Sequence, residues 1–252
     1  MFWWRADGDG LTRAVTDRHD GVSAGRYGSL NLGGQVGDDP AAVRANRHTV
    51  AAALGLPESR LVFMRQCHSA RVEVLEGPWS GAAPDCDGVV TTATDLALAV
   101  LSADCVPVLL TDSHTGAIAA VHAGRVGLTA GVLTAALSAL REVGVAVDVP
   151  GRVDAVVGPS VCGRCYEVPA AMCDEVTAIE PATRATSWQD TPALDLAAGV
   201  VAQLSRAGVR VQRLPGCTRE DSDLYSHRGA AGGPTGRFAS IVLRYAAPAG
   251  PR

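Results

Sequence analysis

One thiol and two imidazoles border apolar segments that we predict to be β-strands. Cys105 precedes the run PVLLT, His122 closes the run AIAAVH, and His68 lies in the loop RQCHSA between two further apolar runs. A thiolate and two neutral imidazoles form a ligand set that catalytic zinc uses while a fourth position stays open. These ligands would come from separate segments, so no spacing rule supports them. A buried thiol beside a satisfied polar pair is the alternative.

Arg47 is a second residue that the pattern around it does not explain. The segment 40–54 has an apolar stripe through Val43, Val50 and Leu54, and Arg47 falls on this stripe one turn after Val43. An arginine that faces the interior must meet a carboxylate, a group of carbonyl oxygens or a bound anion. A structural ion pair is the alternative to a site for an anion.

Three loop segments carry further candidates. The glycine-rich stretch 21–40 would let the backbone approach a ligand closely, but it is not a GxGxxG motif after a strand, so ordinary turns are the alternative. CGRC at 162–165 is a redox candidate, and no second CxxC is present to complete a metal site. The stretch 217–240 is a site candidate, with a solvated loop as the alternative, because it combines turn residues with Cys217, Tyr225, His227, Arg228 and Arg237.

The elements that must position these residues follow from short apolar runs and helix-terminal signals. Asp39 and Pro40 predict the start of a helix that ends before Gly55. Thr191 and Pro192 predict the start of a later helix in the same way, and Gly208 predicts its end. The predicted helices are 40–54, 128–143, 168–180 and 193–207. The predicted strands are 61–64, 71–76, 87–92, 96–101, 107–111, 117–122, 153–158, 209–214 and 240–245.

The order of these elements indicates the fold class. Most strands come before the second helix, which excludes a repeating βαβ chain and favours an α+β protein with mixed sheets covered by helices. If the runs 96–101, 107–111 and 117–122 pair as neighbours, Cys105 and His122 would face the same end of one sheet.

Length and composition restrict the classes of function. A chain of 252 residues can bury a large core, and we expect one catalytic domain over 1–252 with a frayed tail at 246–252. The chain has no Lys, which excludes Schiff-base and P-loop lysine mechanisms. A net charge of −4 with scattered Arg argues against nucleic-acid partners, and no apolar run reaches membrane-spanning length. Seven Cys, an odd number without regular spacing, predict a reduced, cytoplasmic protein.

Several stretches together resemble the YfiH/YlmD family, whose members are described as laccase-domain or polyphenol oxidase proteins and as purine nucleoside phosphorylases. The stretches occur in the family's order over about residues 21–243: GVSAGRYGSLNLGGQVGDDPAAVRANR, RQCHSARV, DCDGVVT, SADCVPVLLTD, VHAG, GPSVCGRCYEV and CTREDSDLYSHR. The resemblance implies a layered α/β/β/α fold with mixed sheets. It also implies a Zn²⁺ site made by His68, Cys105 and His122.

The function implied by the resemblance is zinc-dependent phosphorolysis of purine nucleosides (adenosine, inosine, guanosine or methylthioadenosine), with adenosine deamination in the same pocket. Arg47 is the first candidate to bind phosphate, and Arg228 and His227 are the next candidates for the same role. The other substrate-binding candidates are Asn31 and Gln66. The partners would be nucleosides and phosphate only, and the oligomeric state is not determined.

Three other functions remain open. Cys105 and His122 could be the nucleophile and base of a cysteine hydrolase. A copper-dependent phenol oxidase is disfavoured, because six His cannot supply several copper centres. A non-catalytic purine-binding protein would bind its ligand without turnover.

The sequence departs from the family pattern at three places. HAGRVG replaces the usual HAGWRG, so that Arg125 and Val126 stand where Trp and Arg are expected. Arg164 replaces the first Cys of the pair before YEV, and Gly229 follows Arg228 where a second Arg is usual. The three zinc ligands are retained.

Overall fold

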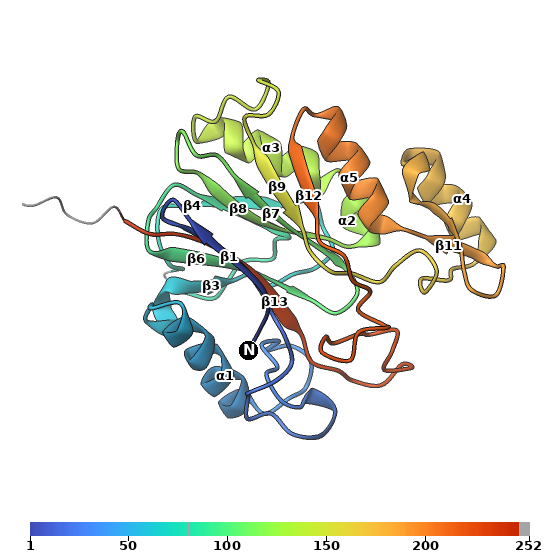
Figure 1. Cartoon of the computed structure of the whole chain (residues 1–252), viewed down its shortest axis with the longest axis horizontal. Coiled ribbons are helices and arrows are strands. Elements are labelled where there is room, and N and C mark those ends of the chain that lie inside the picture. Colours follow the sequence, from blue (N-terminus) through green and yellow to red (C-terminus); the bar gives the residue numbers. More distant parts are fainter. Residues whose placement is uncertain (80, 247–252) are drawn as a thin grey trace, which may run out of the picture.

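Two mixed β-sheets stack face to face at the centre of the molecule, and helices cover both outer faces (Figure 1). The computed structural model describes residues 1–79 and 81–246, so all but the first residue of the predicted tail lies outside the described residues. The two stacked sheets and the helices on their outer faces confirm the predicted α+β class and α/β/β/α layering.

The first sheet has the strand order β1-β2-β13-β6-β3, and the second has the order β12-β9-β7-β8-β5-β4. Both sheets are mixed, because β3 is parallel to β6 in the first, and β4 to β5 and β12 to β9 in the second. The strands of the first sheet are β1 (Phe2–Gly8), β2 (Leu11–Thr16), β3 (Leu61–Phe63), β6 (Leu96–Ser102) and β13 (Phe238–Arg244). Those of the second are β4 (Val72–Leu75), β5 (Gly88–Thr91), β7 (Val106–Thr111), β8 (Ile118–Ala123), β9 (Asp154–Val157) and β12 (Arg210–Arg213).

Among the described residues, one α-helix covers the first sheet, and four α-helices lie on the side of the second (Figure 1). Helix α1 (Pro40–Ala53) packs Val50 and Leu54 on the strands of the first sheet. The others are α2 (Arg125–Thr129), α3 (Val132–Glu142), α4 (Ala170–Ile179) and α5 (Leu196–Arg206). A small ribbon of β10 (Arg184–Thr186) and β11 (Pro192–Leu194) lies between α4 and α5 in the sequence.

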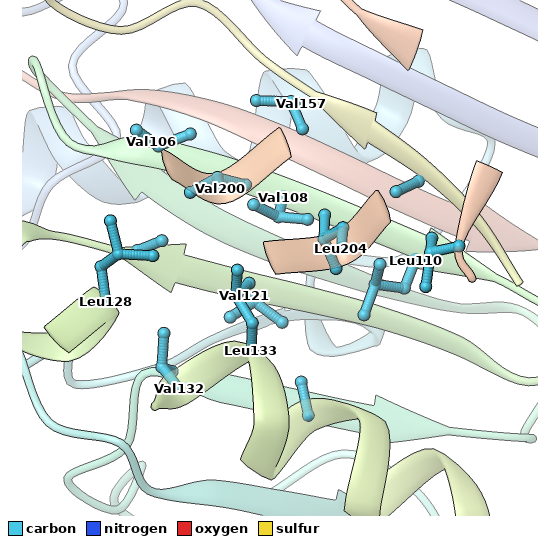
Figure 2. Close-up of a cluster of buried hydrophobic side chains, with 14 of the residues drawn as sticks. Val106, Val108, Leu110, Val121, Leu128, Val132, Leu133, Val157, Val200 and Leu204 are labelled. Atoms are coloured by element: carbon cyan, nitrogen blue, oxygen red, sulfur yellow. The ribbon is translucent and has the colours of Figure 1, made fainter. Parts of the chain in front are cut away.

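Continuous apolar strands fill the space on both faces of the second sheet. On its inner face, Leu109 and Ile118 belong to one buried cluster with Leu98 and Val100 of the first sheet. Its outer face packs against the helices, and Figure 2 shows valines of β7 and β8 beneath side chains from α3 and α5. Burial on both faces is the reason that these strands lack an alternating polar pattern.

Three of the predicted details are wrong. The runs 96–101 and 107–111 do not pair, because β6 belongs to the first sheet and β7 to the second. The predicted helix 128–143 is interrupted at Gly131, whose φ of +89° ends α2 and begins α3. Pro192 opens β11 rather than a helix, and the N-cap of α5 is Asp195.

Other local signals act as expected. The Asp39 side chain accepts a hydrogen bond from the N–H of Ala41 at 2.9 Å and caps α1, which begins at Pro40. Gly55 follows the helix with a φ of +71°. The strands β1 and β2 were not predicted. Within the described ranges, no helix has the length and apolar character needed to cross a bilayer.

Candidate functional site

The three predicted zinc ligands, His68, Cys105 and His122, lie close together near the connection from β6 of the first sheet to β7 of the second. The Nε2 atom of His68 lies 3.7 Å from the Sγ atom of Cys105, and the rings of His68 and His122 meet edge to face with centroids 4.9 Å apart. The ligand atoms of all three residues lie within 4.8 Å of one another. The three side chains that the sequence analysis grouped therefore lie close together, although β6 and β7, the strands on either side of Cys105, belong to different sheets.

Each of the three comes from a different kind of segment. His68 follows β3 in a loop and has a φ of +61°, Cys105 lies in the connection from β6 to β7, and His122 is within β8. His122 lies opposite Pro107 in the β7–β8 register, and its backbone N–H donates to the carbonyl of Asp87 at 2.7 Å, which fixes its position. Anchoring on strands holds a ligand more precisely than a mobile loop would.

A buried carboxylate orients the site from behind. Asp87 is fully buried, and its Oδ1 atom lies 2.8 Å from Nδ1 of His122. With Nδ1–H donated to this oxygen, Nε2 of His122 is left as the atom that can face a metal or the Cys105 thiol. The same carboxylate accepts hydrogen bonds from the N–H of His68 at 3.0 Å and from the Oγ of Ser69 at 2.8 Å. Asp87 therefore fixes both the imidazole of His122 and the backbone turn that carries His68.

The ionisation of these groups is coupled. Burial disfavours the thiolate of Cys105, but the imidazoles of His122 and His68 outweigh burial and lower the pKa of the thiol to about 6. Burial likewise opposes the charged form of His122, while Cys105 and Asp87 raise the pKa of the imidazole to about 9. Asp87 remains ionised because the hydrogen bonds from His122 and Ser69 hold the pKa of its carboxyl well below the usual range despite burial. A low-pKa thiol is both a competent metal ligand and a competent nucleophile.

The glycine of the HAG motif leaves room for the cluster. A Cβ atom on Gly124 would lie 2.6 Å from Cδ2 of His68 and 3.2 Å from Sγ of Cys105. Its φ of −74° is ordinary for any residue, so the requirement for glycine is one of space rather than of backbone conformation.

A cavity of about 1120 Å³ opens over the three residues. Three half-buried arginines of the described residues line it. One is Arg125, and backbone carbonyl groups hold the other two: Arg47, whose Nε and Nη2 atoms donate to the carbonyl of Leu32 at 3.0 and 2.8 Å, and Arg237, whose Nη1 donates to the carbonyls of Thr235 and Gly236. Burial lowers the pKa of both guanidinium groups. Neither forms an ion pair with a described residue, so the alternative explanation of Arg47 as half of a structural ion pair does not hold.

The glycine-rich stretch serves this arrangement. A Cβ atom on Gly33 would lie 2.8 Å from Cγ of Arg237, and one on Gly34 would lie 3.4 Å from Nη2 of Arg47. At Gly33 the chain can therefore pass this close to the Arg237 side chain only because no Cβ is present, whereas a Cβ at Gly34 would make an ordinary contact with Arg47. The Arg47 guanidinium also lies 4.0 Å from the centroid of the Phe63 ring, which holds it against the wall of the cavity.

The remaining predicted residues divide into two groups. Gln66, His227 and Arg228 line the cavity with the cluster. The Gln66 amide pairs with both backbone groups of Leu101 at 2.8 Å, and Arg228 stacks on Tyr166 at 4.7 Å. Asn31, in contrast, is fully buried and does not line the cavity. Its side chain instead accepts from the N–H groups of Gly33 and Arg237 and donates to the carboxylate of Asp38, so it positions the arginine loops.

The departures from the family pattern also lie at the cavity. Arg125 and Val126 line it at the start of α2, with Val126 exposed. A guanidinium is therefore present at this wall, one position earlier in the sequence than the family pattern places it.

Sequence reasoning missed two acidic residues, Asp87 and Asp104. Asp104 is buried beside Cys105 and accepts hydrogen bonds at 2.6 Å from the Oγ1 of Thr218, the Oγ of Ser226 and the N–H of Arg228. It thereby fastens the loop of Arg228 to the connection that carries Cys105. Both could have been found in the sequence, because each stands directly before a buried apolar strand, in DCDGVV and in SADCVPV. A carboxylate at such a position must be hydrogen-bonded or paired, which marks it as a candidate for a structural or functional role.

The fold consists of two stacked mixed sheets, and an arginine-lined cavity opens over the cluster of His68, Cys105 and His122. Comparison with known proteins shows which family has this combination. Residues 12–245 match the family described as multi-copper polyphenol oxidoreductase laccase. This chain belongs to that family, which includes YlmD and YfiH.

Known relatives match over nearly the whole chain. A protein of Streptomyces coelicolor named purine nucleoside phosphorylase SCO2081 is 53% identical over 236 residues, which cover 93% of this chain and 96% of that protein. The crystal structure of YlmD from Geobacillus stearothermophilus has a TM-score of 0.85 at 28% identity and covers 97% of this chain and 99% of its own. YfiH from Bacillus licheniformis has a TM-score of 0.82 at 27% identity, with 93% and 92% covered.

Proposed function

We propose that this protein is a zinc-dependent purine nucleoside phosphorylase. The observation that carries the proposal is a pair of half-buried arginines, Arg47 and Arg237, that form no ion pair with a described residue. They lie in the same cavity as the His68, Cys105 and His122 cluster. The printed name of the Streptomyces coelicolor relative supports the same substrate class. The volume of about 1120 Å³ is ample for a nucleoside together with an anion.

The arginines would bind the phosphate. Burial without an ion pair to a described residue leaves two guanidinium charges that a phosphate dianion can neutralise. Guanidinium groups bind phosphate oxygens through paired hydrogen bonds. The carbonyl groups of Leu32, Thr235 and Gly236 hold the two side chains in place before phosphate arrives. Such preorganisation reduces the cost of positioning the nucleophile.

The reaction would be a displacement at the ribose. A phosphate oxygen forms a bond to C1′ while the bond from C1′ to the purine nitrogen breaks, and its electron pair leaves with the purine, which then takes up a proton. The protein must hold the anion beside the sugar and stabilise the charge on the departing base. We assign His227 and Arg228 to the nucleoside, because both line the same cavity as the cluster.

The cluster fits a zinc ion by its donor set. One thiolate and two imidazole Nε2 atoms are common zinc ligands, and the hydrogen bond between His122 and Asp87 is the outer contact that zinc-binding histidines usually make. A bound zinc ion would supply Lewis acidity toward the substrate. We extend the proposal to a zinc-dependent deamination of adenosine as a side activity.

The test is an assay of the zinc-loaded protein and of the chelator-treated protein with adenosine, each with and without phosphate, followed by chromatography of the products. We expect adenine and ribose-1-phosphate only when phosphate is present, and inosine only in the presence of zinc. Inosine, guanosine and methylthioadenosine are assayed in the same way to rank the substrates. Failure to cleave any of the four while zinc is stoichiometric would refute the phosphorylase proposal.

A cysteine hydrolase is the second candidate, and a specific arrangement favours it. Asp87, His122 and Cys105 form a chain of carboxylate, imidazole and low-pKa thiol, which is the order of an activated cysteine nucleophile. Zinc on the thiolate would block this chemistry, so a purified protein that lacks zinc and reacts covalently with thiol-directed esters would favour the hydrolase.

A copper-dependent phenol oxidase is not part of the proposal. In the described part of the chain, the groups of His, Cys and acidic side chains close enough to share a metal include only two histidines, His68 and His122. Several copper centres would require many more imidazole ligands.

A further inference from the structure

A second cluster of metal-ligating side chains lies apart from the one already described. It consists of Cys162, Cys165, Cys217 and Glu220, whose ligand atoms lie within 4.8 Å of one another. The Sγ of Cys165 lies 3.3 Å from Oε1 of Glu220, and the Sγ of Cys217 accepts a hydrogen bond from the N–H of Cys162 at 3.4 Å. No step of the proposed reaction uses these four side chains.

The two halves of the cluster are built in the same way. The N–H groups of Cys165 and Tyr166 both donate to the carbonyl of Cys162 at 3.0 Å. The N–H groups of Glu220 and Asp221 likewise donate to the carbonyl of Cys217, at 3.0 and 2.9 Å. Each turn brings residues i and i+3 to one side, which is the way a C-x₂-C pair presents its ligands.

Backbone contacts join the two turns. Ser160 and Cys217 form a parallel bridge, and the N–H of Thr218 donates to the carbonyl of Ser160 at 3.1 Å. The turn CTRE therefore supplies the second half of the site, with Cys217 and Glu220 in place of a second CxxC. This is why a search of the sequence for paired CxxC motifs does not find it.

Apolar packing alone does not explain the cluster. Cys165 and Cys217 are buried, as structural thiols often are, but the carboxylate of Glu220 is directed onto the Cys165 thiol. The indole N–H of Trp188 donates to the same carboxylate oxygen at 3.2 Å and fixes its orientation. A ligand carboxylate that is itself held by a hydrogen bond is typical of a metal site.

The surroundings match the charge that such a site would carry. Three thiolates and one carboxylate around a divalent cation have a net charge of −2, after three thiol protons have been released to solvent. Two guanidinium groups are nearby: Arg219 donates from Nη1 to the carbonyl of Cys165 at 3.3 Å, and Arg164 lies 4.4 Å from the ring of Trp188. Arg164 is one of the residues that depart from the family pattern.

We propose that Cys162, Cys165, Cys217 and Glu220 bind a structural zinc ion. A tetrahedral zinc site with Zn–S bonds of about 2.3 Å places its ligand atoms about 3.8 Å apart, so the present cluster closes with shifts of about 1 Å. Four protein ligands leave no open position, which is the mark of a structural rather than a catalytic zinc. The ion would fasten the segment 160–166 to the segment 217–220.

This fastening would support one wall of the cavity. Tyr166, one residue after Cys165, carries Arg228 on its ring at 4.7 Å, and Thr218, one residue after Cys217, donates to Asp104 at 2.6 Å. Both contacts lead directly to residues that line the cavity. The proposed ion therefore acts on the position of the wall and takes no part in the chemistry.

The test is the zinc content per chain, measured by elemental analysis of dialysed protein. We expect two equivalents in the wild type, one in a Cys162→Ser/Cys217→Ser variant, and one in a His68→Ala/Cys105→Ser variant. Cys173→Ser is the matched control, since Cys173 is a buried thiol on α4 outside both clusters, and it should keep both equivalents. A wild type with a single equivalent that is lost only in the His68→Ala/Cys105→Ser variant would overturn the proposal.

A spectroscopic measurement covers the case in which the Cys162→Ser/Cys217→Ser variant fails to fold. With Cys105 replaced, the Cys162, Cys165 and Cys217 cluster is the remaining described metal site that contains a thiol. We expect Co²⁺ added to the metal-free His68→Ala/Cys105→Ser protein to give thiolate-to-cobalt charge transfer and tetrahedral visible bands. Absence of these bands would refute the site. Denatured wild type with two fewer reactive thiols than its seven cysteines would also refute it, in favour of a disulfide.

Discussion

The Nδ1 atom of His122 lies 2.8 Å from the Oδ1 atom of Asp87, a carboxylate that is fully buried behind the candidate metal cluster. This contact links β8 to the turn of His68, because the same carboxylate accepts from the backbone of that turn. Two of the three proposed ligands thus depend on one residue that touches no metal itself.

Asp87→Asn should weaken zinc binding at the His68, Cys105 and His122 site by about 10–100-fold. Asparagine retains the size of the side chain but removes the negative charge that accepts Nδ1–H of His122. That hydrogen bond favours the tautomer in which Nε2 can bind the metal. The measurement is a competition titration with a chromophoric chelator. Asp148→Asn is the control, since Asp148 is an exposed loop residue paired only with Arg141, and it should bind zinc as the wild type does. Equal affinity in all three proteins would show that Asp87 does not position the site.

Arg47→Ala should raise the phosphate concentration needed for half-maximal activity by about 10–100-fold, as expected when a charge-assisted hydrogen bond worth about 1.5–3 kcal/mol is lost. Zinc content should not change, because Arg47 contacts the carbonyl of Leu32 and the Phe63 ring rather than a proposed ligand. Arg44→Ala is the matched control on the exposed side of α1. The measurement is the initial rate as a function of phosphate, and an unchanged phosphate saturation curve would remove Arg47 from the mechanism.

Gly124→Ala should impair zinc binding more than stability. The added methyl would meet His68 at 2.6 Å and Cys105 at 3.2 Å, and overpacking of this kind costs about 1–3 kcal/mol when the neighbours must move. Here the neighbours are the ligands themselves, so their relocation should lower zinc affinity. Gly8→Ala, where an added Cβ meets nothing within 4 Å, is the control. Zinc affinity is compared with the midpoint of urea unfolding, and wild-type affinity in Gly124→Ala would contradict the steric argument.

The ion pair of Glu180 with Arg206 should make stability depend on acidic pH. The hydrogen bond from Arg206 lowers the pKa of the buried Glu180 carboxyl below its ordinary value of 4.5. A lowered pKa in the folded state means that this contribution is complete above about pH 4.5 and disappears as the pH falls through the lower, folded-state pKa.

Glu180→Gln should therefore destabilise the protein by about 1–2 kcal/mol at pH 7, between the values for exposed and buried ion pairs. The difference from wild type should shrink as the pH falls below 4. Urea unfolding across this range checks the expectation, with Glu175→Gln on the exposed face of α4 as the control. A constant difference at every pH would show that the stabilisation does not come from ionised Glu180.

The amino-acid sequence by itself determined the local elements. The N-cap Asp39 and the terminal Gly55 define the ends of α1, and the apolar runs locate β6, β7 and β8 to within one or two residues, because these signals act between neighbours in the chain. The family motifs likewise identified the three residues of the candidate zinc cluster.

Only the tertiary structure decided which elements meet. Strands buried on both faces carry no pattern that identifies their partners, so the placement of β6 and β7 in different sheets could not be derived from their sequences. The same holds for Asp87 behind His122, for Asn31 outside the cavity, and for Cys217 and Glu220 opposite CGRC. These contacts join residues far apart in the chain, and long-range packing, rather than any local preference, brings them together.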